Sequence, residues 1–369
     1  MKIKEYFIIV LVYFHVIFMA SRHKTSFSDD ELEYYSRQIV LRDFGLEGQR
    51  KLKSSRVCVV GVGGLGSPVS IQLASIGVGY LRLIDRDVVE ISNLQRQHIY
   101  GIDKLGYPKV EAAAERLRHL NPFIEVEPVP MSLRPGNAES LVEGVDLVVD
   151  CLDSMSARYA LNRACVKHGI PMIYGAVIMN VGNCTSILPG ETPCLECFQG
   201  NIDDRNLPSC ATSGVHPSII SIIASIQVSE STRILLGLEP NLAGELLFCD
   251  LGDLSFERIG ISRVITCPVC GATHGPEDLV TPVLQEICGR DGKRVYVYTP
   301  DDDLDVPLES MNSYLMESGY EIHVRGQLGT TFIGDNLKAS ILKSGVVILE
   351  GPKSEQEAMT IIEDLKDVF

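Results

Sequence analysis

The stretch 56-RVCVVGVGGLGSPVS-70 decides the fold that we expect for this chain. Residues 56–61 form an apolar run that predicts a buried strand, and residues 67–76 predict the helix that follows it. The loop between them contains four glycines, at Gly61, Gly63, Gly64 and Gly66. Glycines at such a junction let backbone amides approach phosphate oxygens at the positive end of a helix.

A second strand is predicted over residues 81–85, and it ends on Asp85, about twenty residues after the glycine loop. An acid at that position can accept hydrogen bonds from ribose hydroxyls. The pattern therefore predicts nucleotide binding. The alternative is a glycine turn that serves only close packing, and the loop alone does not distinguish a dinucleotide from ATP.

Strands and helices continue to alternate after this unit. A helix is predicted from Pro108 to residue 120, then a strand over 146–150, a helix over 157–168 and a strand over 171–176. This alternation predicts an α/β fold with a doubly wound, mostly parallel, Rossmann-like sheet. Upstream, Ser28 begins a predicted capping box, and a helix is expected over residues 34–41.

Composition sets limits on the whole chain. The 369 residues suggest two domains, and 48 acidic against 33 basic side chains give a net charge of −15. Such acidity argues against nucleic acid as a main partner, because that binding needs clustered Lys and Arg. Eleven cysteines cannot all pair within one chain, which favours a reducing, cytoplasmic compartment.

The first residues differ from the rest of the chain. Residues 6–19 are apolar apart from His15 and follow Lys2 and Lys4. The run is short for a membrane span, and no clean signal cleavage site follows it. We treat residues 1–22 as an extension with three open interpretations: an over-long gene model, a membrane anchor, or a buried or interfacial helix.

The pattern changes again near the C-terminus. Residues 23–280 read as one domain, and residues 281–369 read as a small α+β domain with 16 acidic and 8 basic residues. Strands are predicted near 295–299, 321–325, 330–333, 339–342 and 346–349, with helices over 308–317 and 354–368. We expect this domain to support docking of a partner or dimerisation, or to act only as a stabilising appendage.

Polar and cationic side chains follow the second strand: Asn93, Arg96, Gln97 and Lys109. Hydride transfer has little use for converging cations near the phosphates. Cleavage of a nucleoside triphosphate moves negative charge onto pyrophosphate, and preset cations stabilise that charge. Arg96 and Lys109 therefore favour ATP, and the alternative is an ordinary surface salt-bridge pair.

Two Cys-x-x-Cys pairs predict a metal site. Cys194 and Cys197 form the first pair, and Cys267 and Cys270 form the second. Four thiolates in two tight turns make a closed tetrahedral zinc site of the structural kind. The alternative is a redox dithiol, which the presence of two pairs disfavours.

Taken together, the motifs resemble the MoeB/ThiF/HesA family of ubiquitin-activating-type adenylyltransferases over about residues 34–270. The stretches that carry the resemblance are YYSRQIVLRDFG (34–45), GVGGLGS (61–67), LIDRDVVEISNLQRQ (83–97), GYPKVEAA (106–113), VVDCLDS (148–154), PCLEC (193–197) and CPVC (267–270). The resemblance implies a symmetric dimer that adenylates the C-terminal glycine of a ubiquitin-like or sulfur-carrier protein ending in Gly-Gly. It also implies a place in molybdopterin, thiamine or tRNA thiolation pathways.

The resemblance also implies roles for single residues. Asp85 would hold the ribose, Asn93 and Arg96 the triphosphate, and Lys109 the α-phosphate. Asp153 would bind Mg²⁺, although the family usually has Asp-Asn where this chain has Asp153-Ser154. A carboxylate is already ionised at neutral pH, so the reaction needs positioning and charge neutralisation rather than a general base.

Two further roles follow from the resemblance. Arg37 would enter the active site of the other protomer, which would make dimerisation a condition of activity. Cys210 would form a covalent bond with the activated carrier, with an uninvolved thiol as the alternative. A sulfurtransferase or cysteine desulfurase is an implied partner. The competing functions are adenylation of another carboxylate, on a peptide or a tRNA base, and an NAD-dependent dehydrogenase.

Overall fold

The computed structural model describes residues 27–200, 202–204, 213–272, 279, 282–288 and 294–369. The chain falls into two parts, residues 1–51 and residues 52–369, and each is described by itself. The predicted extension of residues 1–22 lies outside the described residues. The predicted domain boundaries stay predictions.

The first part contains short helices: α2 (Asp29–Tyr34), α3 (Ser36–Ile39) and the beginning of α4 (Gly45–Ser54). The capping box at Ser28 is confirmed, because Ser28 Oγ accepts from the Glu31 N–H at 3.2 Å and the Glu31 carboxylate accepts from the Ser28 N–H at 2.8 Å. The single helix predicted over 34–41 is wrong. Tyr35 leaves the helical range at φ −90° and ψ 4° and separates α2 from α3.

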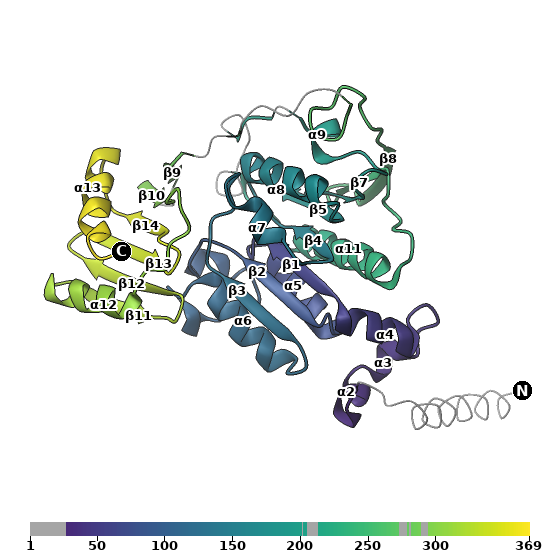
Figure 1. Cartoon of the computed structure of the whole chain (residues 1–369), viewed down its shortest axis with the longest axis horizontal. Helices are drawn as coiled ribbons and strands as arrows, with labels where there is room; N and C mark the ends of the chain where they lie inside the picture. The colour runs from purple at the N-terminus through teal and green to yellow at the C-terminus, as the bar shows by residue number, and fades with distance from the viewer. Residues whose placement is uncertain (1–26, 201, 205–212, 273–278, 280–281, 289–293) are drawn as a thin grey trace, which may run out of the picture. The chain divides into compact units, whose positions relative to one another are not determined.

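The second part begins with an eight-stranded sheet in the order β3-β2-β1-β4-β5-β6-β7-β8 (Figure 1). The strands are β1 (Arg56–Val60), β2 (Tyr80–Ile84), β3 (Glu125–Val129), β4 (Leu147–Asp150), β5 (Met172–Ile178), β6 (Val181–Ile187), β7 (Glu245–Asp250) and β8 (Ser255–Gly260). Strands β1 to β5 pair in parallel, which confirms the expected α/β class and the predominantly parallel sheet.

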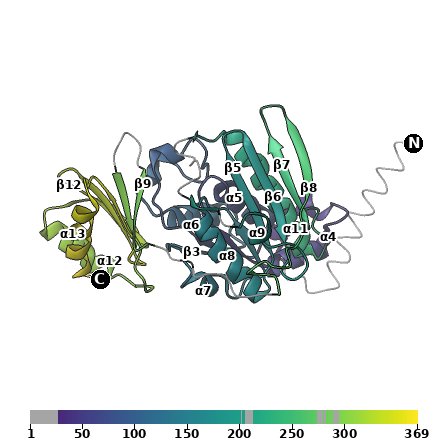
Figure 2. The ribbon, with the colours of Figure 1, turned by 90° about the horizontal axis from the view of Figure 1, so that it is seen from above.

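The last three strands of this sheet are antiparallel, which the sequence analysis missed. Figure 2 shows β7 and β8 as a long hairpin at the end of the sheet. Every residue of β4 is buried, whereas β8 is exposed along almost its whole length. A strand so exposed has no continuous apolar run, and apolar runs were the signal from which the other strands were predicted.

The chain leaves β1 in one direction through β2 and β3 and then returns to the other side of β1 with β4 and β5. Helices cover both faces of the sheet: α5 (Gly66–Ile76), α6 (Lys109–Leu120), α7 (Ala138–Val142), α8 (Met155–His168) and α11 (Pro217–Leu236). The loops after β1 and β4 therefore diverge, and such a switch point is where open α/β sheets bind ligands.

Helix α11 is the one described helix that is long and apolar enough to cross a membrane. Half of its most apolar window is buried inside the protein, and the helix packs against α5, β5 and β6. Its apolar character is therefore explained by its place in the core beside the first sheet.

A second, antiparallel sheet follows in the order β11-β12-β13-β14-β10-β9, and we name it the C-terminal sheet. Its strands are β9 (Leu284–Cys288), β10 (Arg294–Tyr298), β11 (Glu321–Arg325), β12 (Gly329–Gly334), β13 (Leu337–Leu342) and β14 (Val347–Glu350), with helices α12 (Leu308–Glu317) and α13 (Glu355–Lys366). The predicted elements from residue 295 onward are all present, and β9 was not predicted. Phe332, Leu315 and Ile362 belong to the core between sheet and helices.

One buried acid ties α11 to the antiparallel end of the first sheet. The Glu230 side chain, 2% exposed, accepts from Ser186 Oγ at 2.9 Å and from the Leu242 N–H at 2.8 Å. It also accepts from the N–H and the side-chain amide of Asn241, at 3.1 and 3.2 Å. A buried carboxylate is tolerated here because four donors surround it.

We expect Glu230→Gln to lower the free energy of unfolding by about 1–3 kcal/mol, because its amide would turn an NH₂ group toward groups that are themselves donors. Glu239→Gln removes the same charge at an exposed position and should change it by less than about 0.5 kcal/mol. Denaturant unfolding of both variants measures the difference. Equal effects would contradict the assigned role of Glu230.

Candidate nucleotide site and cysteine cluster

The glycine loop makes a tight turn, and at two of its positions only glycine fits. Gly61 has φ +86°, and a Cβ there would lie 2.7 Å from the Cys151 carbonyl oxygen. A Cβ on Gly66 would lie only 1.9 Å from the carbonyl oxygen of Gly61. Helix α5 therefore begins directly against the end of β1.

The same loop offers backbone donors. The Gly61 N–H donates to the Ile84 carbonyl at 2.8 Å, and the Val62 N–H donates to Asp85 at 2.7 Å. Within the described part of the chain, the amides of Gly63 and Gly64 have no hydrogen-bond acceptor. Free amides at the N-terminus of an eleven-residue helix form an anion-binding arrangement.

Asp85 follows the last residue of β2 and joins the loop to the strand. One carboxylate oxygen accepts from the Val62 N–H, and the other accepts from the Asp87 N–H at 2.8 Å. Burial raises the pKa of Asp85, and Lys109 acts against that increase. Each oxygen keeps a second acceptor position, so the carboxylate can still bind a hydroxyl.

Lys109 lies at the start of α6 and contacts an acid that the sequence analysis missed. Its Nζ is 2.7 Å from Asp87 Oδ2, and its side chain is 7% exposed, against 45% for Asp87. Burial alone would lower the pKa of Lys109, but Asp87 and Asp85 outweigh it and hold the pKa above its usual value. Conversely, burial acts to raise the pKa of Asp87, but Lys109 and Arg86 hold it below its usual value.

The signal for Asp87 was present in the sequence, two residues after Asp85 in the same stretch. It could not be interpreted there, because an acid beside a strand is ordinarily a solvated surface group. The structure shows that Asp87 and Lys109 are neighbours, through their ion pair and through the backbone bond from the Lys109 N–H to the Asp87 carbonyl, at 2.9 Å.

Three predicted residues follow Glu90 along the chain. Asn93 Oδ1 accepts from the Glu90 N–H at 3.1 Å and closes the short helix η1 (Ile91–Asn93). Arg96 donates to the Ser92 carbonyl at 2.9 Å, and a Cβ on Gly64 would lie 4.0 Å from Arg96 Nε. The predicted cation therefore lies beside the glycine loop.

Gln97 is 3% exposed and lies close to the same loop. A Cβ on Gly63 would lie 3.8 Å from its Nε2. Its Oε1 is buried and has no partner among the described residues. A buried polar atom without a partner is uncommon, and at a glycine loop it suits a ligand or an ordered water.

Asp153 lies three residues after the end of β4 and is exposed. Its negative charge is one of the causes, after Asp87 and Asp85, that hold the pKa of Lys109 above its usual value. The helix that follows it, α8, is held by Asp204, which accepts from the N–H groups of Met155 and Ser156 at 2.5 and 3.0 Å.

Two predicted residues are not placed at this site. Arg37 is an exposed residue of α3, in the part of the chain that is described separately. Cys210 lies outside the described residues. Their roles stay predictions.

The four predicted zinc ligands do converge, and their sulfur atoms all lie within 4.8 Å of one another. Cys194 is 3.6 Å from Cys267 and 4.0 Å from Cys197, and Cys197 is 3.3 Å from Cys270, measured between Sγ atoms. A tetrahedron with Zn–S bonds of about 2.3 Å has sulfur atoms about 3.8 Å apart. The donors therefore fit a zinc ion.

The backbone around the cysteines has the tight turns that a knuckle needs. The Gly271 N–H donates to the Cys267 carbonyl at 2.9 Å, and a Cβ on Gly271 would lie 2.4 Å from the Ile265 carbonyl oxygen. The Val264 N–H donates to the Cys197 sulfur at 3.5 Å. Such bonds orient and partly neutralise a thiolate that binds a metal.

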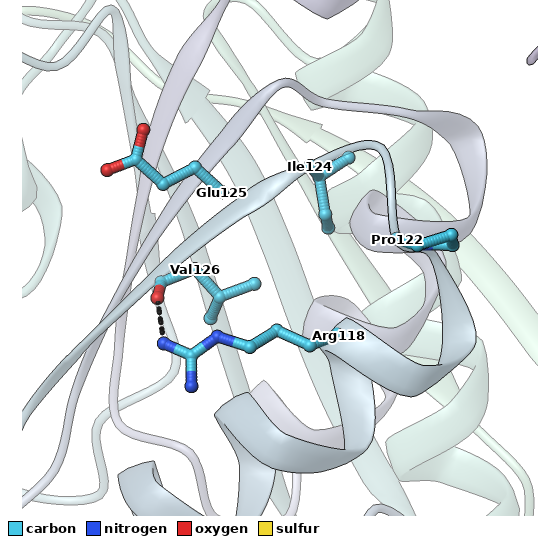
Figure 3. A pocket seen from close by; sticks show the side chains of 5 residues that line it. All are labelled: Arg118, Pro122, Ile124, Glu125 and Val126. Carbon is cyan, nitrogen blue, oxygen red and sulfur yellow. Dashed lines mark hydrogen bonds between the residues drawn. The ribbon is translucent and has the colours of Figure 1, made fainter.

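A surface hollow of about 600 Å³ lies elsewhere on the first sheet (Figure 3). Its lining residues belong to the end of α6, the connection that follows it and the beginning of β3: Arg118, Pro122, Ile124, Glu125 and Val126. It therefore lies at the amino ends of the parallel strands, opposite the glycine loop. Arg118 donates there to the Val126 carbonyl at 2.6 Å and covers part of the edge strand β3.

Fold and site together define a doubly wound α/β protein with a glycine loop, a cationic cluster beside it and a four-cysteine knuckle. Residues 35–269 match the ThiF family, and the chain belongs to that family. The resemblance on which the sequence analysis relied is thereby confirmed.

Individual relatives agree with this assignment. The SAMP-activating enzyme E1 of Haloferax volcanii is 43% identical over 242 residues, 65% of this chain and 89% of that protein. The sulfur carrier protein adenylyltransferase of Thermus thermophilus is 38% identical over 266 residues, 70% of this chain and 97% of that protein. The crystal structure of Escherichia coli MccB with ATP shares the fold, with a TM-score of 0.58 at 24% identity over 64% of this chain and 73% of that chain.

We expect Gly66→Ala to lower the stability of the protein by about 1–3 kcal/mol, because its Cβ would push α5 away from β1. Gly63→Ala is the matched control, since a Cβ there meets only ordinary contact distances. Thermal unfolding of the two variants gives the comparison. A Gly66→Ala protein as stable as Gly63→Ala would contradict the assigned geometry.

Proposed function

We propose that this protein uses ATP to adenylate the C-terminal glycine carboxylate of a small ubiquitin-like sulfur-carrier protein. The observation that supports this most directly is the buried Lys109 ammonium, held by Asp87 on the same side of the sheet as the free amides of the glycine loop. The relatives with the names sulfur carrier protein adenylyltransferase and SAMP-activating enzyme E1 support the choice of substrate.

The glycine loop and the cations bind the triphosphate in this proposal. The amides of Gly63 and Gly64 donate to phosphate oxygens at the helix N-terminus. Arg96, Asn93 and Gln97 contact the β- and γ-phosphates, and Lys109 contacts the α-phosphate. Lys109 suits that role because its raised pKa keeps it charged at neutral pH.

Two acids complete the nucleotide site. Asp85 accepts hydrogen bonds from the ribose hydroxyls with the acceptor positions that the backbone leaves open. Asp153 binds Mg²⁺, which commonly takes one or two carboxylates together with substrate phosphates. When bound, Mg²⁺ neutralises charge on the phosphates and on the departing pyrophosphate.

The reaction then needs little acid–base chemistry. A C-terminal carboxyl group has a pKa near about 3.5, so the carrier arrives as a carboxylate. One carboxylate oxygen attacks the α-phosphorus, the bond to the bridging oxygen breaks, and pyrophosphate leaves with the electron pair. The protein contributes alignment and positive charge, and alignment alone can supply about 7–11 kcal/mol of the barrier.

The same proposal includes a homodimer, with Arg37 entering the site of the second copy. Cys210 is the candidate for covalent attachment of the activated carrier. A sulfurtransferase or a cysteine desulfurase is the proposed partner that acts on the activated carrier. The finer choice among molybdopterin, thiamine and tRNA thiolation pathways depends on the carrier.

We also propose that the cysteine cluster binds one structural zinc ion. The two cysteine pairs come from distant parts of the chain, and a shared ion would tie residues 194–197 to residues 267–270. All four positions of a tetrahedral ion would be taken by sulfur, which leaves none for catalysis.

The decisive experiment is carrier-dependent exchange of pyrophosphate into ATP, measured with a panel of small proteins that end in Gly-Gly. We expect exchange with at least one carrier and a loss of about a hundredfold or more in Arg96→Ala, which removes charge stabilisation at the phosphates. Arg116→Ala, an exposed arginine on α6, is the control and should retain exchange.

Different outcomes point to different functions. No exchange with any carrier, together with tight NADH binding, would favour a dehydrogenase. Exchange that requires a short peptide or a tRNA in place of a carrier would favour a different carboxylate substrate.

For the cysteine cluster, we expect about one zinc ion per purified chain and a lower melting temperature after chelation, because the ion joins two distant segments. Cys267→Ser should lose the metal, whereas Cys165→Ala, which removes a buried thiol outside the cluster, should keep it. Zinc analysis and thermal melts are the measurements. Unchanged melting after complete chelation would argue against a structural ion.

A further inference from the structure

The Asp87–Lys109 pair stands at the end of a small backbone ladder. The Val89 N–H donates to the Tyr107 carbonyl at 2.8 Å, and the Gly106 N–H donates to the Val89 carbonyl at 2.9 Å. The Lys109 N–H donates to the Asp87 carbonyl at 2.9 Å. We name residues 87–89 and 106–109 the site ladder. Its geometry sets where the Lys109 ammonium lies.

The site ladder packs against the C-terminal sheet. Val88 is buried in one cluster with Val297, Leu342 and Val346, which belong to that sheet or to the turn beside it. A Cβ on Gly329 of β12 would lie 2.8 Å from Pro108 Cγ, so the β12 backbone packs directly against the Pro108 ring. In the site ladder, Asp87 is next to Val88 and Lys109 is next to Pro108. Side chains of successive residues in a ladder point to opposite faces.

Polar contacts fix the same junction. The buried Thr331 Oγ1 donates to the Gly106 carbonyl at 2.6 Å. Glu111, two residues after Lys109, accepts from the N–H groups of Gln327 and Leu328 at 2.9 and 2.8 Å. Both ends of the Lys109 segment are therefore held by the C-terminal sheet.

The match to the ThiF family ends at residue 269, before the C-terminal sheet begins. The Thermus relative is covered over 97% of its length by a match that spans 70% of this chain. The function shared with that relative therefore does not account for the sheet.

We propose that the C-terminal sheet positions Lys109 for catalysis by holding the site ladder, with Thr331 as a positioning residue. This rests on the proposed function. A rigid support matters because a misplacement of a catalytic group by about 1 Å can lower the rate of the chemical step about a hundredfold.

The test compares two contacts between the C-terminal part of the chain and the part that carries the first sheet. Thr331→Val removes the hydroxyl and keeps the shape, and Thr331→Ser restores the hydroxyl. Asp303→Asn weakens the contact with Arg134, whose Nη2 lies 2.7 Å from Asp303. This contact lies outside the site ladder. Full-length proteins are used throughout.

In pyrophosphate exchange we expect Thr331→Val to lower kcat about tenfold with KM for ATP changed less than about twofold. Thr331→Ser should stay within about twofold of the wild type, and Asp303→Asn should retain kcat. An unchanged kcat in Thr331→Val, or an equal loss in Asp303→Asn, would overturn the proposal. An inactive wild type would instead count against the proposed function.

Hydrogen exchange gives a readout that does not depend on activity. In the nucleotide-free protein, Thr331→Val should speed exchange of the amides of Val89, Gly106 and Lys109, while Asp303→Asn should leave them protected. Unchanged protection in Thr331→Val would overturn the proposal even if the enzyme reaction were never observed.

Discussion

The steric constraint between Gly61 and Gly66 is the condition on which the site depends. A side chain at residue 66 would collide with the Gly61 carbonyl, so only glycine lets α5 begin directly at the end of β1. That close approach brings the helix N-terminus to the carboxyl edge of the sheet. Asp85 then fixes the loop through the Val62 N–H, and the divergence of the chain between β1 and β4 leaves this edge open.

The candidate nucleotide site carries buried positive charge, although the chain as a whole is strongly negative. The chain carries a net charge of −15, yet the buried Lys109 ammonium group is held by Asp87, two residues after the Asp85 that binds the glycine loop. A buried amine without counter-charges would tend to lose its proton. The two acids keep it charged, and they belong to the same short segment that leaves β2. The acid that binds the glycine loop and the acid that pairs with Lys109 are thus supplied by one short segment of the chain.

Much of this was predictable from local pattern. The glycine loop, Asp85, the cationic residues and the four cysteines were all identified, because each depends on residue type at fixed spacing. The break at Tyr35, the antiparallel strands β6 to β8, strand β9 and the partner of Lys109 were not. Apolar periodicity continues across Tyr35, and β8 is too exposed to show a buried run. Asp87 stands in a motif that the sequence analysis quoted, but its role depends on its contact with Lys109, 22 residues away.

The sequence by itself determined the family and the α/β class, because motifs encode local backbone geometry, and it singled out the residues of the candidate site. The tertiary structure decided which groups meet. It brought cysteines 73 residues apart within 3.6 Å, and it placed Thr331 against a carbonyl 225 residues earlier in the chain. Such contacts arise from the packing of elements that are far apart in the chain, and a single sequence carries no local signal for them.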